Sequence, residues 1–153
     1  MLTGEHKVVD RYQSILRERM RGLPICNPVL EVQAVGFRAL DQHRLGVLIT
    51  PWFMNLMLLP GDETWSDKPA GTREDYLLPA ENCEFVVNHD EYLGTCLSAV
   101  LFRSLSDFPD QATAVAVAEE VLEELFTPAT ENVQQSAVNS VSRRTLLTGM
   151  GAS

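Results

Sequence analysis

The 153-residue sequence lacks any long hydrophobic run. Its most apolar stretch, residues 45–59, is interrupted by a threonine, a proline and an asparagine. It therefore falls short of the ~18 apolar residues that a membrane helix needs. The first 20 residues are amphipathic and charged, which is not the pattern of a secretory signal. We therefore expect a cytoplasmic protein without a membrane span.

Cysteine is also scarce, and the three cysteines, Cys26, Cys83 and Cys96, lie far apart. No C-x-x-C pair is present, which argues against a zinc, iron–sulfur or thioredoxin-type site. We expect buried, unpaired thiols, because free cysteine behaves as a small apolar residue.

Motifs of catalysis are missing as well: there is no G-x-S-x-G, Walker, dinucleotide-binding or H-E-x-x-H pattern. His89, Asp90 and Glu91 are adjacent, but consecutive residues of a turn converge poorly on one atom. We favour a solvated hairpin tip there, and expect a protein that is not an enzyme and has no cofactor or bound metal.

Basic residues are few in the body of the chain. Residues 45–128 hold 3 Lys and Arg against 15 Asp and Glu, a net charge of −12. Residues 1–44 carry +2 and residues 129–153 carry +1, which completes the total of −9. An acidic body argues against nucleic acid as a partner, since that binding needs Lys and Arg. It would attract a basic peptide, or serve only to keep the surface soluble.

The apolar periodicity predicts an α+β fold. Apolar residues at helical spacing predict an N-terminal helix over 5–20 and a C-terminal helix that begins near Pro109 and ends at Phe126. Between them we expect five strands, with a bulge at Gly36 and a bend at Pro51. The strands are expected at residues 30–40, 44–50, 53–60, 83–88 and 94–102. Short turns between strands predict one antiparallel sheet with both helices on one face, a two-layer sandwich.

The domain organisation follows from composition. Residues 61–76 are polar and contain two glycines and a proline, so they are expected to form one long loop. Residues 1–127 are expected to form a single domain. Residues 128–153 are polar without a clear period and are expected to form a flexible tail.

One run is unusually rich in aromatic and methionine residues. It places Trp52, Phe53, Met54, Met57 and Trp65 within 14 positions. Such side chains dominate the centres of binding surfaces, although two neighbouring strands with these residues could equally be core. The polar residues within the run favour a partly exposed face.

This run also carries a family resemblance. Residues 49–61 read ITPWFMNLMLLPG and are followed by Trp65. Together with Leu78-Pro79, Phe85, the 92–98 strand and Ser104-Leu105-Ser106, the block resembles the HybE/HupJ family of [NiFe]-hydrogenase assembly chaperones. The resemblance implies a two-layer fold, no catalytic residues and a bacterial cytoplasmic escort. Its clients would be the hydrogenase small-subunit precursor, which bears a twin-arginine signal, and/or the large subunit. It would hold them until cofactor insertion and assembly are complete.

We therefore predict a partner-binding surface that combines the aromatic and methionine run with an acidic rim suited to a basic signal. The rim residues come from the predicted long loop and are Asp62, Glu63, Asp67, Glu74 and Asp75. One alternative is a small nickel carrier or accessory enzyme of hydrogenase maturation that uses His89, Asp90 and the cysteines. A structural subunit that stays in the mature hydrogenase is a further alternative.

The sequence SRRTLLTG at residues 142–149 is similar to the opening of a twin-arginine export signal. It is not expected to act as one, because six residues follow Leu147 and the apolar core of a signal needs roughly 7–15. It is either a basic tail or a mimic of the client signal. In the second case Arg143, Arg144, Leu146 and Leu147 would occupy the domain's own binding site.

Overall fold

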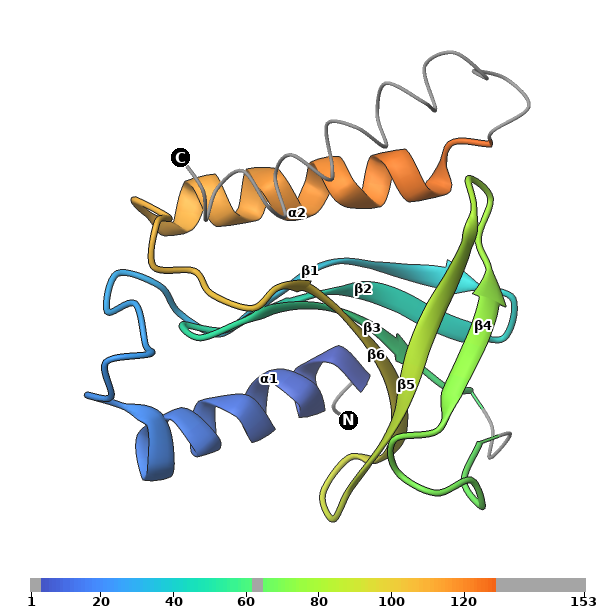
Figure 1. Cartoon of the computed structure of the whole chain (residues 1–153), viewed down its shortest axis with the longest axis horizontal. Coiled ribbons are helices and arrows are strands. Elements are labelled where there is room, and N and C mark those ends of the chain that lie inside the picture. The colour runs from blue at the N-terminus through green and yellow to red at the C-terminus, as the bar shows by residue number, and fades with distance from the viewer. Residues whose placement is uncertain (1–3, 62–64, 129–153) are drawn as a thin grey trace.

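A computed structural model describes residues 4–61 and 65–128 of the chain (Figure 1). Two helices flank a six-stranded antiparallel sheet, which confirms the α+β class and the antiparallel sheet. None of the described helices is long and apolar enough to cross a membrane. The elements in chain order are α1 (Gly4–Ile15), the π-helical turn η1 (Leu16–Met20), β1 (Gln33–Leu40), β2 (His43–Ile49), β3 (Met54–Leu59), β4 (Arg73–Leu77), β5 (Asn82–Asp90), β6 (Gly94–Phe102) and α2 (Gln111–Phe126).

The sheet has the strand order β1-β2-β3-β6-β5-β4. All five predicted strands are present. The register of β1 against β2 shifts between Val35 and Arg38, which confirms the bulge at Gly36, where φ is +63°. Pro51 lies in the bend between β2 and β3, as expected from a residue that has no N–H to donate to a ladder.

The sixth strand, β4, begins inside the segment predicted to be a long loop and ends one residue beyond it. Its sequence, REDYL, is mostly charged, and its burial alternates between exposed and half-buried residues. A strand at the edge of a sheet has one strand neighbour and tolerates charged residues, so it carries little of the apolar signal that reveals a central strand. The loop is correspondingly shorter than predicted.

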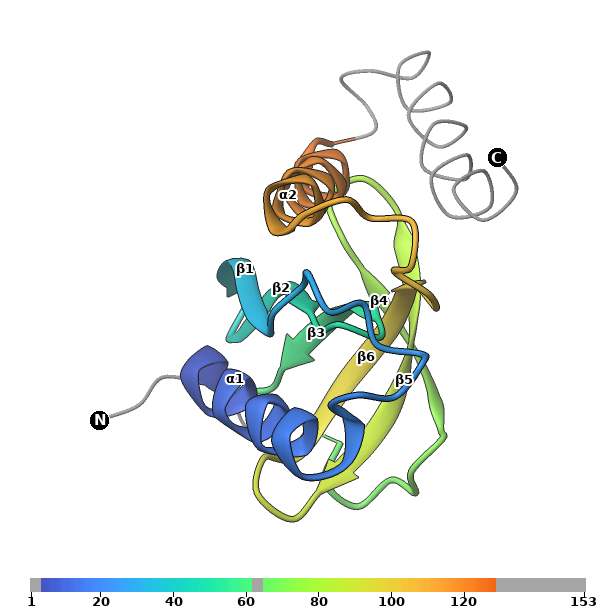
Figure 2. The ribbon, with the colours of Figure 1, turned by 90° about the vertical axis from the view of Figure 1, so that its left-hand side faces the viewer.

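The two helices lie on opposite faces of the sheet, so the prediction that both cover one face is wrong (Figures 1 and 2). Strand β2 shows why, because Val47 and Ile49 point into the cluster under α2 while Leu48 points into the cluster under α1. A strand with consecutive buried apolar residues needs cover on both faces. The result is three layers, with the sheet in the middle.

Helix α2 begins with a side-chain cap, since Asp110 Oδ1 accepts a hydrogen bond from Thr113 N at 2.8 Å. Its buried stripe packs on the larger of the two clusters and consists of Ala114, Ala118, Val121, Leu122 and Leu125. Leu122 packs over Gly36, where an added Cβ would lie 2.6 Å from the leucine Cδ1. The bulge therefore brings the backbone of β1 close beneath the helix.

Candidate partner-binding site

Three of the five apolar residues predicted to form a binding surface lie in the core. Met54, Met57 and Trp65 are at most 5% exposed. Met54 and Trp65 belong to the cluster under α2, whereas Met57 belongs to the cluster under α1. They face opposite sides of the sheet and do not form one continuous surface.

Trp52 and Phe53 are half-buried at the β2–β3 bend. The buried Thr50 organises this bend, because its Oγ1 accepts hydrogen bonds from the backbone N–H groups of Trp52 and Phe53 at 3.2 and 3.0 Å. Tyr12 of α1 packs edge-on against Phe53, with 5.6 Å between ring centroids, and lies 6.4 Å from Trp52. Burial raises the pKa of Tyr12 to about 12, so the ring stays neutral. The bend is therefore held by the Thr50 hydrogen bonds and by packing against Tyr12 of α1.

The loop that follows η1 presents an apolar surface whose residues were not among the predicted binding residues. Leu23, Ile25 and Val29 are 43%, 53% and 52% exposed, and we call these three residues the apolar patch. A cavity of about 230 Å³ adjoins the patch, and its walls include Leu16, Leu30 and Pro51. The sequence signal was present in residues 23–30, LPICNPVL, a loop with two prolines and five large apolar residues or cysteines. Clustered exposed apolar residues of this kind mark protein contacts.

Asn27 fixes this loop in place. Its side-chain Nδ2 donates to the carbonyls of Leu105 and Phe108 at 2.8 and 2.9 Å, and its backbone N–H donates to Pro51 O at 2.9 Å. Cys26 Sγ donates to Met20 O at 3.1 Å. The patch is thus held by contacts to three separate segments, and a partner would not have to order it on binding.

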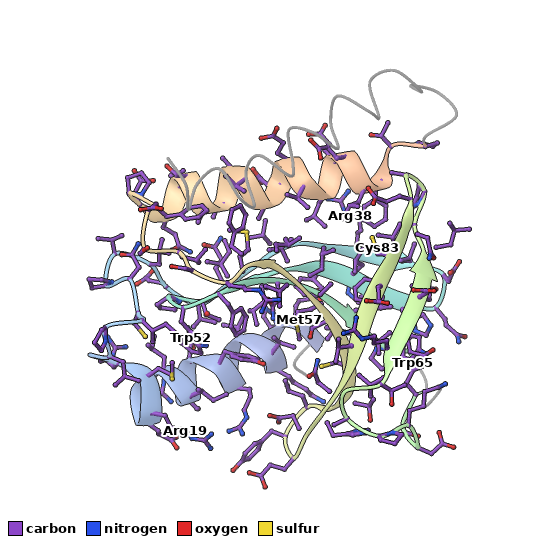
Figure 3. The ribbon with its side chains drawn as sticks, viewed as in Figure 1. Arg19, Arg38, Trp52, Met57, Trp65 and Cys83 are labelled. Carbon is purple, nitrogen blue, oxygen red and sulfur yellow. The ribbon has the colours of Figure 1, made fainter. Side chains whose placement is uncertain are left out.

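The charges on the helical turn that leads into the apolar patch are mainly basic, whereas the exposed Glu31 follows the loop on its other side. Arg21 lines the cavity, and Arg17 and Arg19 are exposed on η1, which leads into the loop; Glu18 is the one acid in that stretch. Trp52 lies at the same end of the sheet, whereas Trp65, near the predicted acidic rim, lies at the far end (Figure 3). The structure therefore separates the apolar surface from the acidic one.

The acidic residues of the predicted rim have different environments. Asp67 and Asp75 are exposed, and Glu74 forms a 2.9 Å ion pair with Lys68. Glu74 and Asp75 belong to β4 rather than to a loop. Asp62 and Glu63 lie outside the described residues, as do Arg143, Arg144, Leu146 and Leu147 of the tail motif.

The residues of the alternative metal site do not converge. The ring nitrogens of His89 contact Thr95 Oγ1 at 3.0 Å and Lys68 O at 2.5 Å, and Asp90 is paired with Arg11. Cys83 and Cys96 pack on opposite faces of the sheet. Among residues 4–61 and 65–128, no group of three or more His, Cys, Asp or Glu side chains could hold a metal ion. The three cysteines are thiols and not members of disulfides, with Cys96 buried and the other two half-buried.

A larger cavity of about 400 Å³ lies between α1 and the β5–β6 turn. Its walls include Asp10, Arg11 and Glu18 of the first helical segment and Tyr92 of the turn. Arg11 lies over the Tyr92 ring, 4.4 Å from its centroid. These walls are mostly charged or already paired, so the cavity is less suited to an apolar segment of a partner than the apolar patch is.

Comparison with known proteins identifies relatives along most of the chain. The family model for "[NiFe]-hydrogenase assembly, chaperone, HybE" matches residues 4–149. "Hydrogenase expression/formation protein HupT" of Azotobacter chroococcum mcd 1 is 43% identical over 122 residues, which cover 78% of this chain and 80% of HupT. "Probable rubredoxin HupJ" of Rhodobacter capsulatus is 39% identical over 120 residues, and the match spans 43% of its length.

One solved structure shares the fold. The solution structure of HybE from Escherichia coli superposes with a TM-score of 0.65 over 81% of this chain and 77% of that chain. The sequence identity is 20%, so this likeness speaks for the architecture and not for individual binding residues.

Proposed function

Because this chain belongs to the HybE family of [NiFe]-hydrogenase assembly chaperones, we propose that it is a non-catalytic escort of hydrogenase subunits. It would act in the cytoplasm on the small-subunit precursor, the large subunit or both. It would hold its client until cofactor insertion and assembly are complete, and then release it.

The apolar patch is the observation that supports this proposal. A chaperone that holds a client without chemistry needs exposed apolar area that does not collapse into its own core. Leu23, Ile25 and Val29 supply that area on a loop fixed by Asn27. Fully burying such a side chain contributes about 1.5–3 kcal/mol, and these three are about half-buried already. The patch could therefore provide several kcal/mol to a complex.

The charge beside the patch indicates what part of a client would bind there. Arg17, Arg19 and Arg21 would repel the arginine pair of a twin-arginine signal and would favour a segment with apolar and acidic residues. We infer that the patch contacts the body of a client rather than its signal. Trp52 joins this proposed contact because it is half-buried and follows Pro51, which forms part of the cavity wall. Met54, Met57 and Trp65 would contribute indirectly, by shaping the core.

Binding measurements on a patch variant test the proposal. Ile25→Asp places a carboxylate in the centre of the patch and should weaken the binding of small-subunit precursor or large subunit roughly tenfold or more in titration calorimetry. Val100→Asp is the matched control, because Val100 is 47% exposed and lies on β6 rather than in the loop that carries the patch. Both variants should melt close to the parent protein.

A tagged full-length chain recovered from hydrogenase-expressing cells gives a second readout. The proposal predicts co-purification of an unassembled subunit and loss of that subunit with Ile25→Asp. Equal binding by Ile25→Asp and the parent would remove the patch from the mechanism. Failure to bind either hydrogenase subunit would overturn the function itself, and retention of the chain in mature hydrogenase would favour a structural subunit.

A further inference from the structure

Strand β4 leaves one edge of the sheet open. It is the last strand in the order β1-β2-β3-β6-β5-β4, and within the described part of the chain it pairs with β5 alone. An open edge is a row of backbone N–H and C=O groups that can pair with another extended chain. Peptide recognition by addition of a strand uses this geometry.

The hydrogen bonds at the two ends of β4 determine which backbone groups face outward. Val87 N donates to Thr72 O at 2.8 Å, and Leu78 N donates to Glu81 O at 2.9 Å. Thr72 and Leu78, which directly flank β4, make these two bonds. In an antiparallel ladder every second residue is bonded to the neighbouring strand, so the even-numbered residues between them face β5. The N–H and C=O groups of Arg73, Asp75 and Leu77 therefore point away from β5.

The side chains along this edge combine apolar and acidic character. Leu77 is 75% exposed, the highest value among the exposed large hydrophobic side chains of the described residues. Residues 65–84 contain five Asp and Glu against two Lys and Arg, a net charge of −3. Both basic residues are paired with acids, Lys68 with Glu74 at 2.9 Å and Arg73 with Glu84 at 2.7 Å.

The end of α2 adds to the negative potential. Leu125 O in the last turn accepts a hydrogen bond from Ala80 N at 3.0 Å, so the carboxyl end of the helix meets the β4–β5 turn. The carbonyl end of a helix carries a partial negative charge. Glu119, Glu120 and Glu123 are exposed on the same helix. A second copy of the chain would bring a like charge to this edge and be repelled, whereas a basic segment would be attracted.

We propose that the outer edge of β4 binds an extended basic segment of the client as a seventh strand of the sheet. The segment pairs with the backbone of Arg73, Asp75 and Leu77, places an apolar side chain on Leu77 and presents a cationic side chain to Asp75. This inference rests on the proposed function in that the segment belongs to a hydrogenase client. It assigns the basic segment of the client to the β4 edge and the body of the client to the apolar patch.

Amide exchange tests the strand addition directly. The probe is a nine-residue peptide, blocked at both ends, with two adjacent arginines followed by two leucines. At saturating peptide, the exchange of the Arg73, Asp75 and Leu77 amides in the full-length chain should slow at least tenfold by NMR. The Val87 and Leu78 amides, already bonded within the hairpin, should change little. Unchanged exchange of the three outward amides with bound peptide would overturn the proposal.

Modified peptides and variants separate backbone pairing from simple charge attraction. Two peptides carry N-methyl groups on the two alternate sets of backbone amides. Methylation of the set that faces β4 should abolish binding, whereas methylation of the other set should leave binding nearly intact. Replacing both peptide arginines with glutamine should weaken binding roughly two- to thirtyfold, the sum of two exposed ion pairs. Asp75→Lys should weaken binding similarly, whereas Asp107→Lys, a matched exposed acid before α2, should not. Equal loss in both N-methylated peptides, or in both lysine variants, would contradict strand addition at β4.

The outcomes are distinguishable from those for the chaperone function. If full-length subunits bind but the peptide does not protect the edge, this inference fails and the chaperone proposal stands. If the peptide protects the edge but no hydrogenase subunit binds, the edge site stands without its client. If the three amides are protected in peptide-free protein that ultracentrifugation shows to be dimeric, the edge is occupied by a second copy and the inference is wrong.

Discussion

Arg11 Nε lies 3.0 Å from Asp90 Oδ2, so an ion pair fastens α1 to the end of β5. The other oxygen of Asp90 accepts hydrogen bonds from the backbone N–H groups of Tyr92 and Leu93 at 2.7 and 3.0 Å. One carboxylate thus closes the β5–β6 turn and holds the first helix. A second ion pair, Arg44 to Glu5 at 2.8 Å, holds the start of the same helix against β2.

The charge of Asp90 should therefore stabilise the fold in a pH-dependent way. Partial burial raises the pKa of Asp90, but the hydrogen bonds from Tyr92 N, Arg11 and Leu93 N outweigh it and leave the pKa below the usual 3.8. A lowered carboxyl pKa gives stability that is fully present above the unfolded pKa and is lost as pH falls through the folded pKa.

Asp90→Asn tests this, because asparagine keeps an oxygen for the two turn N–H groups and removes the charge. We expect a lower melting temperature than the parent at pH 7 and pH 5, and a difference that shrinks as pH falls below 3.8 and closes once pH is below the folded pKa of Asp90. Thermal melts followed by circular dichroism measure it. A difference that persists unchanged at low pH would show that geometry, and not charge, is responsible.

Gly46 provides a second prediction, on packing. A Cβ at this position of β2 would lie 2.3 Å from Phe37 Cδ1 and 2.8 Å from Phe37 Cα. The backbone contact cannot be relieved by a rotamer change, so Gly46→Ala should reduce the free energy of unfolding by about 1–3 kcal/mol. Gly94→Ala is a comparison for backbone strain alone, because φ is +78° there but no atom lies within 4 Å of an added Cβ. Denaturant unfolding measures both losses, and a Gly46→Ala variant as stable as the parent would contradict this account.

The sequence predicted the parts of the fold whose signals are local and strongly periodic. The helical stripe around Val8, the bulge at Gly36 and the bend at Pro51 all appear as expected. The predicted placement of both helices on one face is wrong because the run from Leu45 to Ile49 is buried at every position and does not alternate. That lack of alternation indicates burial on both faces, and hence a helix on each.

The candidate site was harder to predict because exposure is a tertiary property. Met54 and Ile25 are both apolar, yet Met54 is buried in a central strand and Ile25 is exposed on a loop held by Asn27. No local pattern distinguishes a rigid apolar loop from a core segment. The long-range bonds of Asn27, to residues about 80 positions away, decide it.

The tail motif carries the last prediction, which concerns residues outside the described structure. Arg143 and Arg144, followed by Leu146 and Leu147, have the pattern of a twin-arginine signal, and the body of the domain is acidic. We propose that this segment competes in cis for the surface that binds the basic signal of a client. A tethered competitor acts at an effective concentration of about 1 mM, so even a weak motif would occupy the surface appreciably.

Deletion of residues 141–153 should then tighten the binding of a synthetic small-subunit signal peptide by roughly two- to tenfold. The gain follows because a competitor raises the apparent Kd by a factor of one plus the ratio of its effective concentration to its own Kd. A full-length variant with Arg143→Gln and Arg144→Gln should reproduce the gain, since it removes the charge and keeps the tail. Fluorescence anisotropy of labelled peptide provides the measurement. Unchanged or weaker binding after the deletion would show that the motif does not compete, and a gain with the deletion but not with the glutamine variant would assign the effect to the bulk of the tail.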